Sequence, residues 1–459
     1  MNSIRQNMHF RDLLLLPAFL ITILAGTPAV SQLATKSPAA RAARWQEDLN
    51  YFAAELPARQ IDFFRLIPQD QFERQVNQLR GAVSQLTDAE IILLLSRLVA
   101  SLGVGETSVY IWSVTDSMAL HSYPIQMKWF SDGLAIVAAA PEYKEALGCR
   151  VVKMGSKTPE EVELAVAPYI AHENGAWLHF ESPRYMGLAE LMQNEKIADS
   201  AGHLSLTCAK IGGKEFTVKI APLACPKTSG KMVYADDALH IPTALCRKQP
   251  NSFYWYEYLP RAQTLYIQYN RCTNAPGYPF VSFAGDVLAF ADAHPVQRVI
   301  MDLRFNQGGG SEVVKPLEEG LKSRPILAAP GHLYTLTDSG TFGAGTWAAN
   351  DFHSSLVIPA RFRVGMRGAN DFRQLHALLV GEPTGGKPNH YGRPGTQNQA
   401  TFLLPNSKLA VAYTKKYFIL IPYADPLTLA PDIFVPYSLS DFLSGRDPAL
   451  EAALHQPQP

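Results

Sequence analysis

The spacing of apolar residues changes twice along the chain and divides it into three regions. In the first region apolar residues recur at steps of three and four, which places them on one face of a helix. Two such helices are predicted, from Trp45, Leu49, Phe52 and Leu56 and from Phe72, Val76 and Leu79.

A third helix of this region carries signals at both ends. Thr87 and Glu90 have the spacing of a capping box ahead of the apolar run 91–102, and Gly103 suits a left-handed turn at the end. Residues 34–43, rich in Ala, Ser, Pro and Arg, have no apolar period and are predicted to be a flexible lead. The region 32–107 is therefore expected to hold a flexible lead and a small helical bundle.

The second region, 108–227, shows short alternating runs that are typical of strands. A turn and a helix from Pro159 to Tyr169 interrupt them. Strands are predicted at 108–112, 125–130, 134–138 and 150–154. This region is expected to be strand-rich with one inserted helix.

The third region, 228–459, opens with a polar stretch, 228–251, that is interpreted as a linker or exposed crossing. Strands and helices then alternate, which favours right-handed crossovers and a mostly parallel sheet. The strands are predicted at 264–269, 299–303, 333–337 and 377–380, and the helices at 281–293 and 313–321. The predicted fold class is therefore mixed α/β.

The first residues have the pattern of a secretory signal. Two arginines precede an apolar run at 13–25, and small side chains follow at 29–31, where a signal peptidase cleaves. A membrane anchor is the alternative, but a span needs about 20 apolar residues and Pro17 interrupts this shorter run. We expect a signal peptide at 1–31, no stable membrane span after cleavage, and a secreted or periplasmic protein.

Composition narrows the choice of partners. The 459 residues have a formal net charge of +0, with 47% hydrophobic and 18% charged residues, as in a globular chain of two or three domains. Binding to nucleic acid needs a clustered positive field, and the chain has no excess of Lys and Arg over Asp and Glu that would provide one. Nucleic acid is therefore not an expected partner.

The cysteines leave two interpretations open. All five follow the signal, so an oxidising compartment can pair some of them, and the odd number leaves at least one free. Cys225 and Cys246 bracket a polar stretch and suggest one bridge, while the alternative is that most are small buried hydrophobes. Their spacing matches no metal motif, and no metal or cofactor is expected.

A glycine triplet, Gly308–Gly310, follows a buried strand and precedes a helix. Glycines let the main chain approach closely, so such a loop can direct backbone N–H groups at a negative charge. A phosphate loop is the rival interpretation. However, Lys followed by Ser or Thr is missing after the glycines, and no Rossmann spacing is present.

These residues carry a resemblance to a known family. The segment 302–311 resembles the "DLRxNxGG" loop of the tail-specific, or carboxyl-terminal processing, serine peptidases, and 381–392 resembles their second signature. The strand 333–337 and its turn resemble the segment that presents the nucleophile, and 132–162 resembles a PDZ-like module. The pattern is closest to the tricorn-core branch, and it implies a helical amino-terminal bundle, a PDZ-like module and a crossover-sheet core.

The resemblance implies a serine that attacks a peptide carbonyl, a Lys or His base, and backbone N–H groups that hold the oxyanion. This chain departs from that pattern twice. Where relatives read Thr-Phe-Ser-Ser it reads Thr-Phe-Gly-Ala, so Gly343 fills the nucleophile position. Where they read Gly-Asp-x-His-Thr, Val104 replaces the acid and Glu106 the histidine. Enzymatic activity is therefore uncertain.

Several groups remain as candidates at this site. Lys387 stands where the family's lysine falls and is interpreted either as a general base, if buried, or as a surface lysine. Ser339 or Thr341 is the candidate for a shifted hydroxyl. The backbone N–H groups of Gly309, Gly310 and Ala344 are expected to form a pocket for an oxyanion or a carboxylate.

Three hypotheses follow. The first is a catalytically impaired secreted protein that binds extended peptides or the carboxyl termini of unfolded proteins. Its PDZ-like module would add a peptide to a sheet edge, or would be a structural insert without a ligand. The second is an active serine-type peptidase that uses a shifted hydroxyl with Lys387. The third is a structural envelope protein.

Overall fold

The computed structural model describes residues 37–113, 120–224, 232–353, 375–393 and 400–457. They belong to two compact units, one containing 242–389 and 419–457 and the other 37–241 and 390–418. The mixed α/β class predicted from the sequence is confirmed. The signal region 1–31 lies outside the described residues. Within them, no helix is both long and apolar enough to cross a membrane.

The first unit along the chain begins with a helical bundle. Its helices are α1 (Pro38–Arg59), α2 (Phe63–Leu66), α3 (Gln69–Ala82) and α4 (Asp88–Ala100). The apolar faces predicted for α1 and α3 are buried. The capping box of Thr87 and Glu90 is formed at α4, and Gly103 has a positive φ of 65°.

The predicted flexible lead is wrong from Pro38 onward. Ser37 caps α1 by accepting the N–H of Ala40 at 3.3 Å, and proline suits the first turn of a helix. Arg41 then anchors the helix, because its Nε donates to Asp88 Oδ1 at 2.6 Å. The helix is stabilised by a partner 47 residues away, which a local pattern does not reveal.

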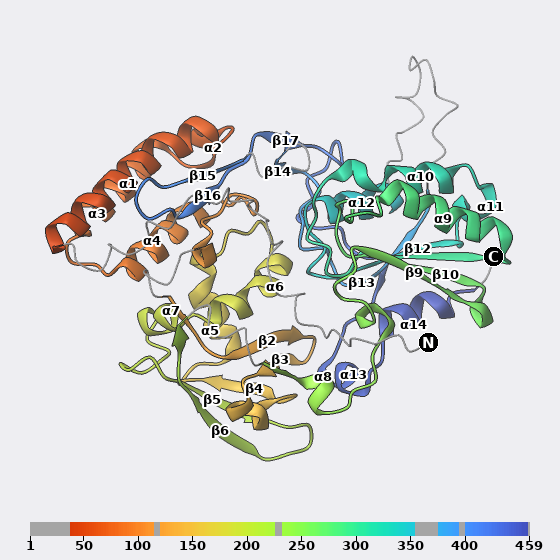
Figure 1. Ribbon diagram of the computed structural model, residues 1–459, viewed down its shortest axis with the longest axis horizontal. Helices are drawn as coiled ribbons and strands as arrows, with labels where there is room; N and C mark the ends of the chain where they lie inside the picture. Colours follow the sequence, from red (N-terminus) through yellow and green to blue (C-terminus); the bar gives the residue numbers. More distant parts are fainter. Residues whose placement is uncertain (1–36, 114–119, 225–231, 354–374, 394–399, 458–459) are drawn as a thin grey trace. The chain divides into compact units, whose positions relative to one another are not determined.

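An antiparallel sheet follows in the same unit, with β8 (Val233–Tyr234) added beside β3. In order, its strands are β2 (Ile125–Phe130), β3 (Gly133–Ala139), β4 (Arg150–Met154), β5 (Leu204–Ala209) and β6 (Glu215–Ile220). A short pair joins β1 (His121–Ser122) to β7 (Leu223–Ala224). The helices are α5 (Pro159–Val166), α6 (Gly175–Met186), α7 (Ala189–Asn194) and α8 (Ala235–Ala238). Figure 1 shows these elements in orange to green.

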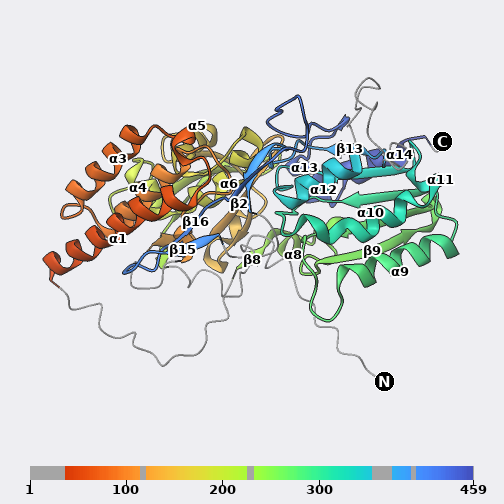
Figure 2. The ribbon, with the colours of Figure 1, turned by 90° about the horizontal axis from the view of Figure 1, so that it is seen from above.

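The segment 390–418 belongs to this unit and contains two short antiparallel strand pairs. They are formed by β14 (His390–Gly392) with β17 (Lys416–Phe418) and by β15 (Thr401–Leu403) with β16 (Ala410–Ala412). The predicted strand 108–112 is reduced to a bridge between Val109 and Val411, because Ile111–Ser113 turns into a 3-10 helix. Figure 2 shows β15 and β16 beside α1.

The other unit is built on one six-stranded sheet. In order, its strands are β18 (Ile433–Phe434), β13 (Leu378–Gly381), β12 (Leu333–Thr337), β11 (Arg298–Asp302), β10 (Thr264–Tyr269) and β9 (Tyr254–Leu259). Neighbouring strands are parallel except for β9, which runs antiparallel to β10. The strand β9 was not predicted.

Helices cover both faces of this sheet (Figures 1 and 2). One face packs against α9 (Phe280–Ala293), α10 (Lys315–Lys322), α11 (Pro325–Ala328) and α12 (Ala344–His353). The other face packs against α14 (Pro448–His455), which follows α13 (Leu439–Ser444).

Cys246 is a buried free thiol, so the suggested bridge to Cys225 is not formed; Cys225 lies outside the described residues.

A buried charge cluster connects the end of β11 to α14. The guanidinium of Arg304 lies 2.5 Å from Asp302 and 2.7 Å from Asp447. Tyr266 donates its hydroxyl to Asp302 at 2.6 Å. Burial alone would raise the pKa of Asp447, but the attraction and hydrogen bonds of Arg304, together with hydrogen bonds from Leu450 and Cys246, outweigh burial and lower that pKa. Asp447 also caps α14 by accepting the N–H of Leu450 at 3.1 Å.

We predict that Asp447→Ala lowers the free energy of unfolding by about 3 kcal/mol, because it leaves a buried guanidinium with half of its partners and removes a helix cap. Asp447→Asn keeps a cap and should lose less. Urea unfolding followed by tryptophan fluorescence measures both. An Asp447→Asn variant as stable as the wild type would contradict the role of the charge, whereas equal losses in the two variants would contradict the role of the cap.

Candidate functional site

Three loops meet at the carboxyl edge of the parallel strands. They follow β11, β12 and β13 and span residues 303–310, 338–343 and 382–389. The main chain of the second loop joins both others: Phe342 donates its N–H to Asn306 O at 2.9 Å, and Thr341 O accepts the N–H of Gly386 at 3.0 Å. Ligands of open α/β sheets bind at this edge, so the loops form the candidate site.

The loops approach so closely that side chains are excluded. A Cβ atom added to Gly308 would lie 2.8 Å from the backbone N of Ala344. One added to Gly386 would lie 2.1 Å from Thr346 Oγ1 and 3.1 Å from the N of Gly343. The glycines of the two signatures therefore pack against the turn before α12. The site is made largely of main chain.

Gly343 occupies the turn between β12 and α12. Its φ is +53°, in the left-handed region, and α12 begins with the next residue. A sharp strand-to-helix turn is the arrangement that presents the nucleophile in α/β-hydrolases. Here the residue at the turn has no side chain, so it provides no attacking group.

The three N–H groups predicted to form an anion pocket are not equivalent. Gly310 donates its N–H to Cys272 O at 2.7 Å, so this donor is already used. Ala344 is the first residue of α12, where backbone N–H groups have no partner within the helix. No hydrogen bond of the described chain uses the N–H of Gly309. Gly309 and Ala344 thus remain as donors.

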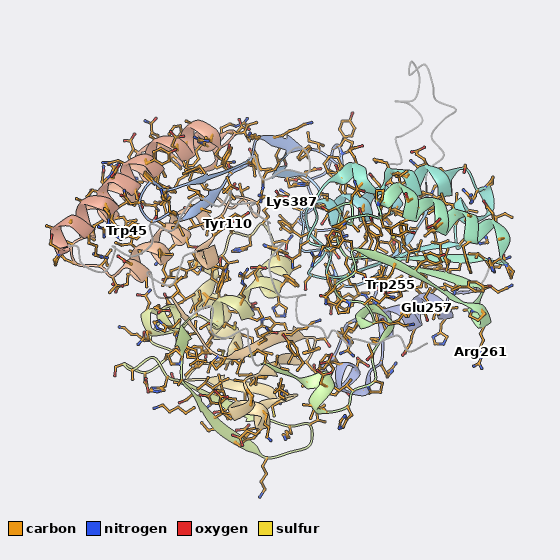
Figure 3. All side chains as sticks on the ribbon, viewed as in Figure 1. Trp45, Tyr110, Trp255, Glu257, Arg261 and Lys387 are labelled. Carbon is orange, nitrogen blue, oxygen red and sulfur yellow. The ribbon has the colours of Figure 1, made fainter. Side chains whose placement is uncertain are left out.

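Lys387 lies in the turn after β13 and is labelled in Figure 3. Its side chain is 16% exposed, and its Nζ atom lies 2.8 Å from Asp425 Oδ2. Asn389 fixes the segment that carries Asp425, because its Nδ2 donates to the carbonyls of Ile421 and Ala424. Lys387 therefore has a carboxylate partner instead of a hydroxyl nucleophile.

The candidate hydroxyls belong to the turn 338–341. Thr341 is fully buried; its Oγ1 donates to Leu303 O at 3.0 Å and accepts the N–H of Asp338 at 3.2 Å. Ser339 is half-buried in the same turn. In this arrangement the Thr341 hydroxyl joins the loops that follow β11 and β12.

Glu106 belongs to the other unit, where it pairs with Arg393. The Nε of Arg393 lies 3.2 Å from Glu106 Oε2, and its other nitrogens donate to Glu106 O and to the hydroxyl of Tyr110, each at 3.3 Å. Burial would lower the pKa of Arg393, but the attraction and hydrogen bonds of Glu106 and Tyr110 together outweigh burial and raise that pKa. The residue at the histidine position thus stabilises the segment 390–393. Sequence reasoning missed Arg393, although it directly follows the second signature.

A second, partly buried charge cluster lies between α10 and α12. Lys315 bridges two carboxylates, with its Nζ 3.1 Å from Glu318 and 2.8 Å from Asp351. Burial raises the pKa of Glu318 to about 7; Asp351 adds to the rise and Lys315 opposes it. Glu318 Oε1 has no hydrogen-bond partner among the described residues. These residues join the helix after the glycine loop to the helix after Gly343.

We predict that the contribution of Glu318 to the stability of the fold depends on pH. Because its folded pKa lies above the ordinary 4.5, its contribution to stability is complete below about pH 4.5 and is lost as the pH rises through about 7. Between pH 5 and pH 8 the wild type should therefore lose on the order of 2 kcal/mol relative to Glu318→Gln. Urea unfolding at both pH values measures this difference.

The exposed Glu312 offers a control in the same segment. Glu312→Gln should follow the wild type at both pH values. If the stability of Glu318→Gln changes with pH as that of the wild type does, the Glu318 carboxylate does not titrate in this range.

The described residues contain no group of three or more His, Cys, Asp or Glu side chains placed to hold a metal ion.

Comparisons with known proteins identify the fold. No family model matches the sequence, and no curated protein matches it. Mature CPAF in complex with lactacystin is similar in structure, with a TM-score of 0.58 and 10% identity over 90% of this chain and 97% of that one. Mature CPAF alone has a TM-score of 0.56 and 11% identity over 90% and 96% of the two chains.

These neighbours have tail-specific protease-like folds, so this chain has a fold of that type. The photosystem II D1 C-terminal processing protease covers 90% of this chain and 99% of its own at 12% identity, but its TM-score of 0.36 is too low to support an argument. At 10–11% identity the likeness to CPAF concerns the fold alone.

Proposed function

We propose that this chain is a secreted, catalytically impaired protein of the tail-specific peptidase type that binds extended peptides or protein carboxyl termini. The observation that carries the proposal is Gly343 at the strand-to-helix turn, where a nucleophile would stand. Two of the groups that could replace it have other partners: Lys387 pairs with Asp425, and the Thr341 hydroxyl donates to Leu303 O.

The proposal extends to the organisation of the chain. It comprises a signal peptide at 1–31, a helical region at 32–107, a PDZ-like module at 108–227 and a peptidase-like core at 228–459, closest in pattern to the tricorn-core branch. The antiparallel sheet β2–β6 with its inserted helix α5 supports the PDZ-like assignment. After cleavage of the signal the protein is secreted or periplasmic.

The chemistry of the pocket favours a carboxylate. Its donors are the N–H groups of Gly309 and Ala344, and the second of these begins a ten-residue helix. The amino terminus of a helix carries a partial positive charge and binds anions. A terminal carboxylate matches both donors better than a neutral amide does.

We expect the purified protein to bind a short unstructured peptide with a free carboxyl terminus about tenfold or more tightly than the same peptide with an amidated terminus. Fluorescence anisotropy with an amino-terminal label on each peptide measures both affinities. No binding of either peptide would favour the structural envelope hypothesis.

Hydrolysis and labelling form a separate test. We predict that the wild type neither cleaves unfolded proteins nor reacts with a fluorophosphonate, which labels activated serine hydroxyls. Cleavage together with labelling of Ser339 or Thr341 would overturn the proposal and support the active peptidase.

The same labelling assay can be applied to variants that restore the missing groups. Gly343→Ser places a hydroxyl at the turn at a cost of roughly 1–2 kcal/mol, because the residue has a left-handed φ. We expect labelling to stay weak in this variant and to increase when Asp425→Ala also releases Lys387. Asp425→Ala alone is the matched control and should remain unlabelled. Equal labelling with and without Asp425 would show that its ion pair does not restrain Lys387.

A further inference from the structure

Asn306 connects three segments around the candidate pocket. It is fully buried, and its Nδ2 donates to Tyr269 O, at the end of β10, at 2.7 Å. Its Oδ1 accepts the N–H of Gly308 at 2.9 Å, and its backbone O accepts the N–H of Phe342, also at 2.9 Å. One residue therefore joins the end of β10, the glycine loop and the turn before α12.

These contacts lie directly beside the two remaining N–H donors. Gly308 precedes Gly309, and Phe342 lies two residues before Ala344. The Oδ1 of Asn306 would lie 3.2 Å from a Cβ added to Gly345, so the amide faces the first turn of α12. The spacing between the N–H groups of Gly309 and Ala344 thus depends on Asn306.

The amide group suits this place better than a carboxylate would. An asparagine side chain provides both a donor, used by Tyr269 O, and an acceptor, used by Gly308. An ionised carboxylate only accepts, and its negative charge would interact with the amino terminus of α12. It would thereby compete with an anionic ligand for the same helix end.

From this geometry we propose that Asn306 is a positioning residue of the pocket: it sets the spacing of the Gly309 and Ala344 donors, and its neutral amide leaves the start of α12 to the carboxylate of the ligand. This inference rests on the proposed function. It adds a residue whose neutral side chain preserves the preference for a free carboxyl terminus.

The test compares Asn306→Asp and Asn306→Ala with Arg298→Met as a control. Arg298 begins β11, at the opposite end of that strand from the glycine loop, and its buried guanidinium donates to Leu454 O and Gln456 O at 2.8 and 2.7 Å. Arg298→Met therefore removes buried hydrogen bonds from the same strand without touching the pocket. Urea unfolding ranks the stability of all variants.

Peptide affinity is measured by anisotropy with the labelled free-carboxyl and amidated peptides. Asn306→Asp should weaken binding of the free-carboxyl peptide about tenfold or more and binding of the amidated peptide much less, so that the preference between the two peptides disappears. Asn306→Ala should weaken both. Arg298→Met should lose stability while keeping the wild-type affinities and preference.

Two failures are distinguishable. If the wild type binds neither peptide, the proposed function fails, together with the pocket that Asn306 would position. If the wild type prefers the free carboxyl terminus and Asn306→Asp keeps that preference, only the role of Asn306 is overturned. A loss of affinity in Arg298→Met that matches that of the Asn306 variants would show that their effect is general destabilisation.

Discussion

The close approach of main chains at the carboxyl edge of the parallel strands is the constraint on which the candidate site depends. A Cβ atom on Gly308 would press against the backbone N of Ala344, and one on Gly386 would press against the Thr346 side chain and lie close to the N of Gly343. A site built in this way provides N–H donors instead of reactive side chains. Its chemistry is therefore suited to holding an oxygen atom that carries negative charge.

Several side chains that suggest reactivity in the sequence are engaged in the fold. Lys387 pairs with Asp425, Glu106 with Arg393, and the Thr341 hydroxyl with Leu303 O. Buried polar groups need partners, and here each partner links segments that are distant in sequence. These groups thus stabilise the fold.

Charged clusters hold the sheet unit on both faces. Arg304 lies between Asp302 and Asp447 toward α14, and Lys315 lies between Glu318 and Asp351 toward α10 and α12. In each cluster one cation joins two carboxylates. In the cluster of Arg304, which is buried, removing one member leaves a buried charge with too few partners. The loops of the site are consequently attached to helices on opposite faces of the sheet.

The sequence by itself determined features that depend on near neighbours. The apolar faces of α1 and α3, the capping box at Thr87 and the bounds of β10 and β12 agree with the pattern of the chain. The glycine loop and Gly343 were also visible in the sequence, because motifs are local. The start of α1, by contrast, depends on the contact of Arg41 with Asp88.

Tertiary structure alone decided which group meets which. Arg393 lies 287 residues from Glu106, and Asn306 lies 37 residues from Tyr269. The N–H of Gly310 is used by Cys272. Such pairings follow from how strands and loops are placed in space, and residue type specifies only that a partner is needed. For this reason the sequence could name the candidate groups but could not say which of them remain available.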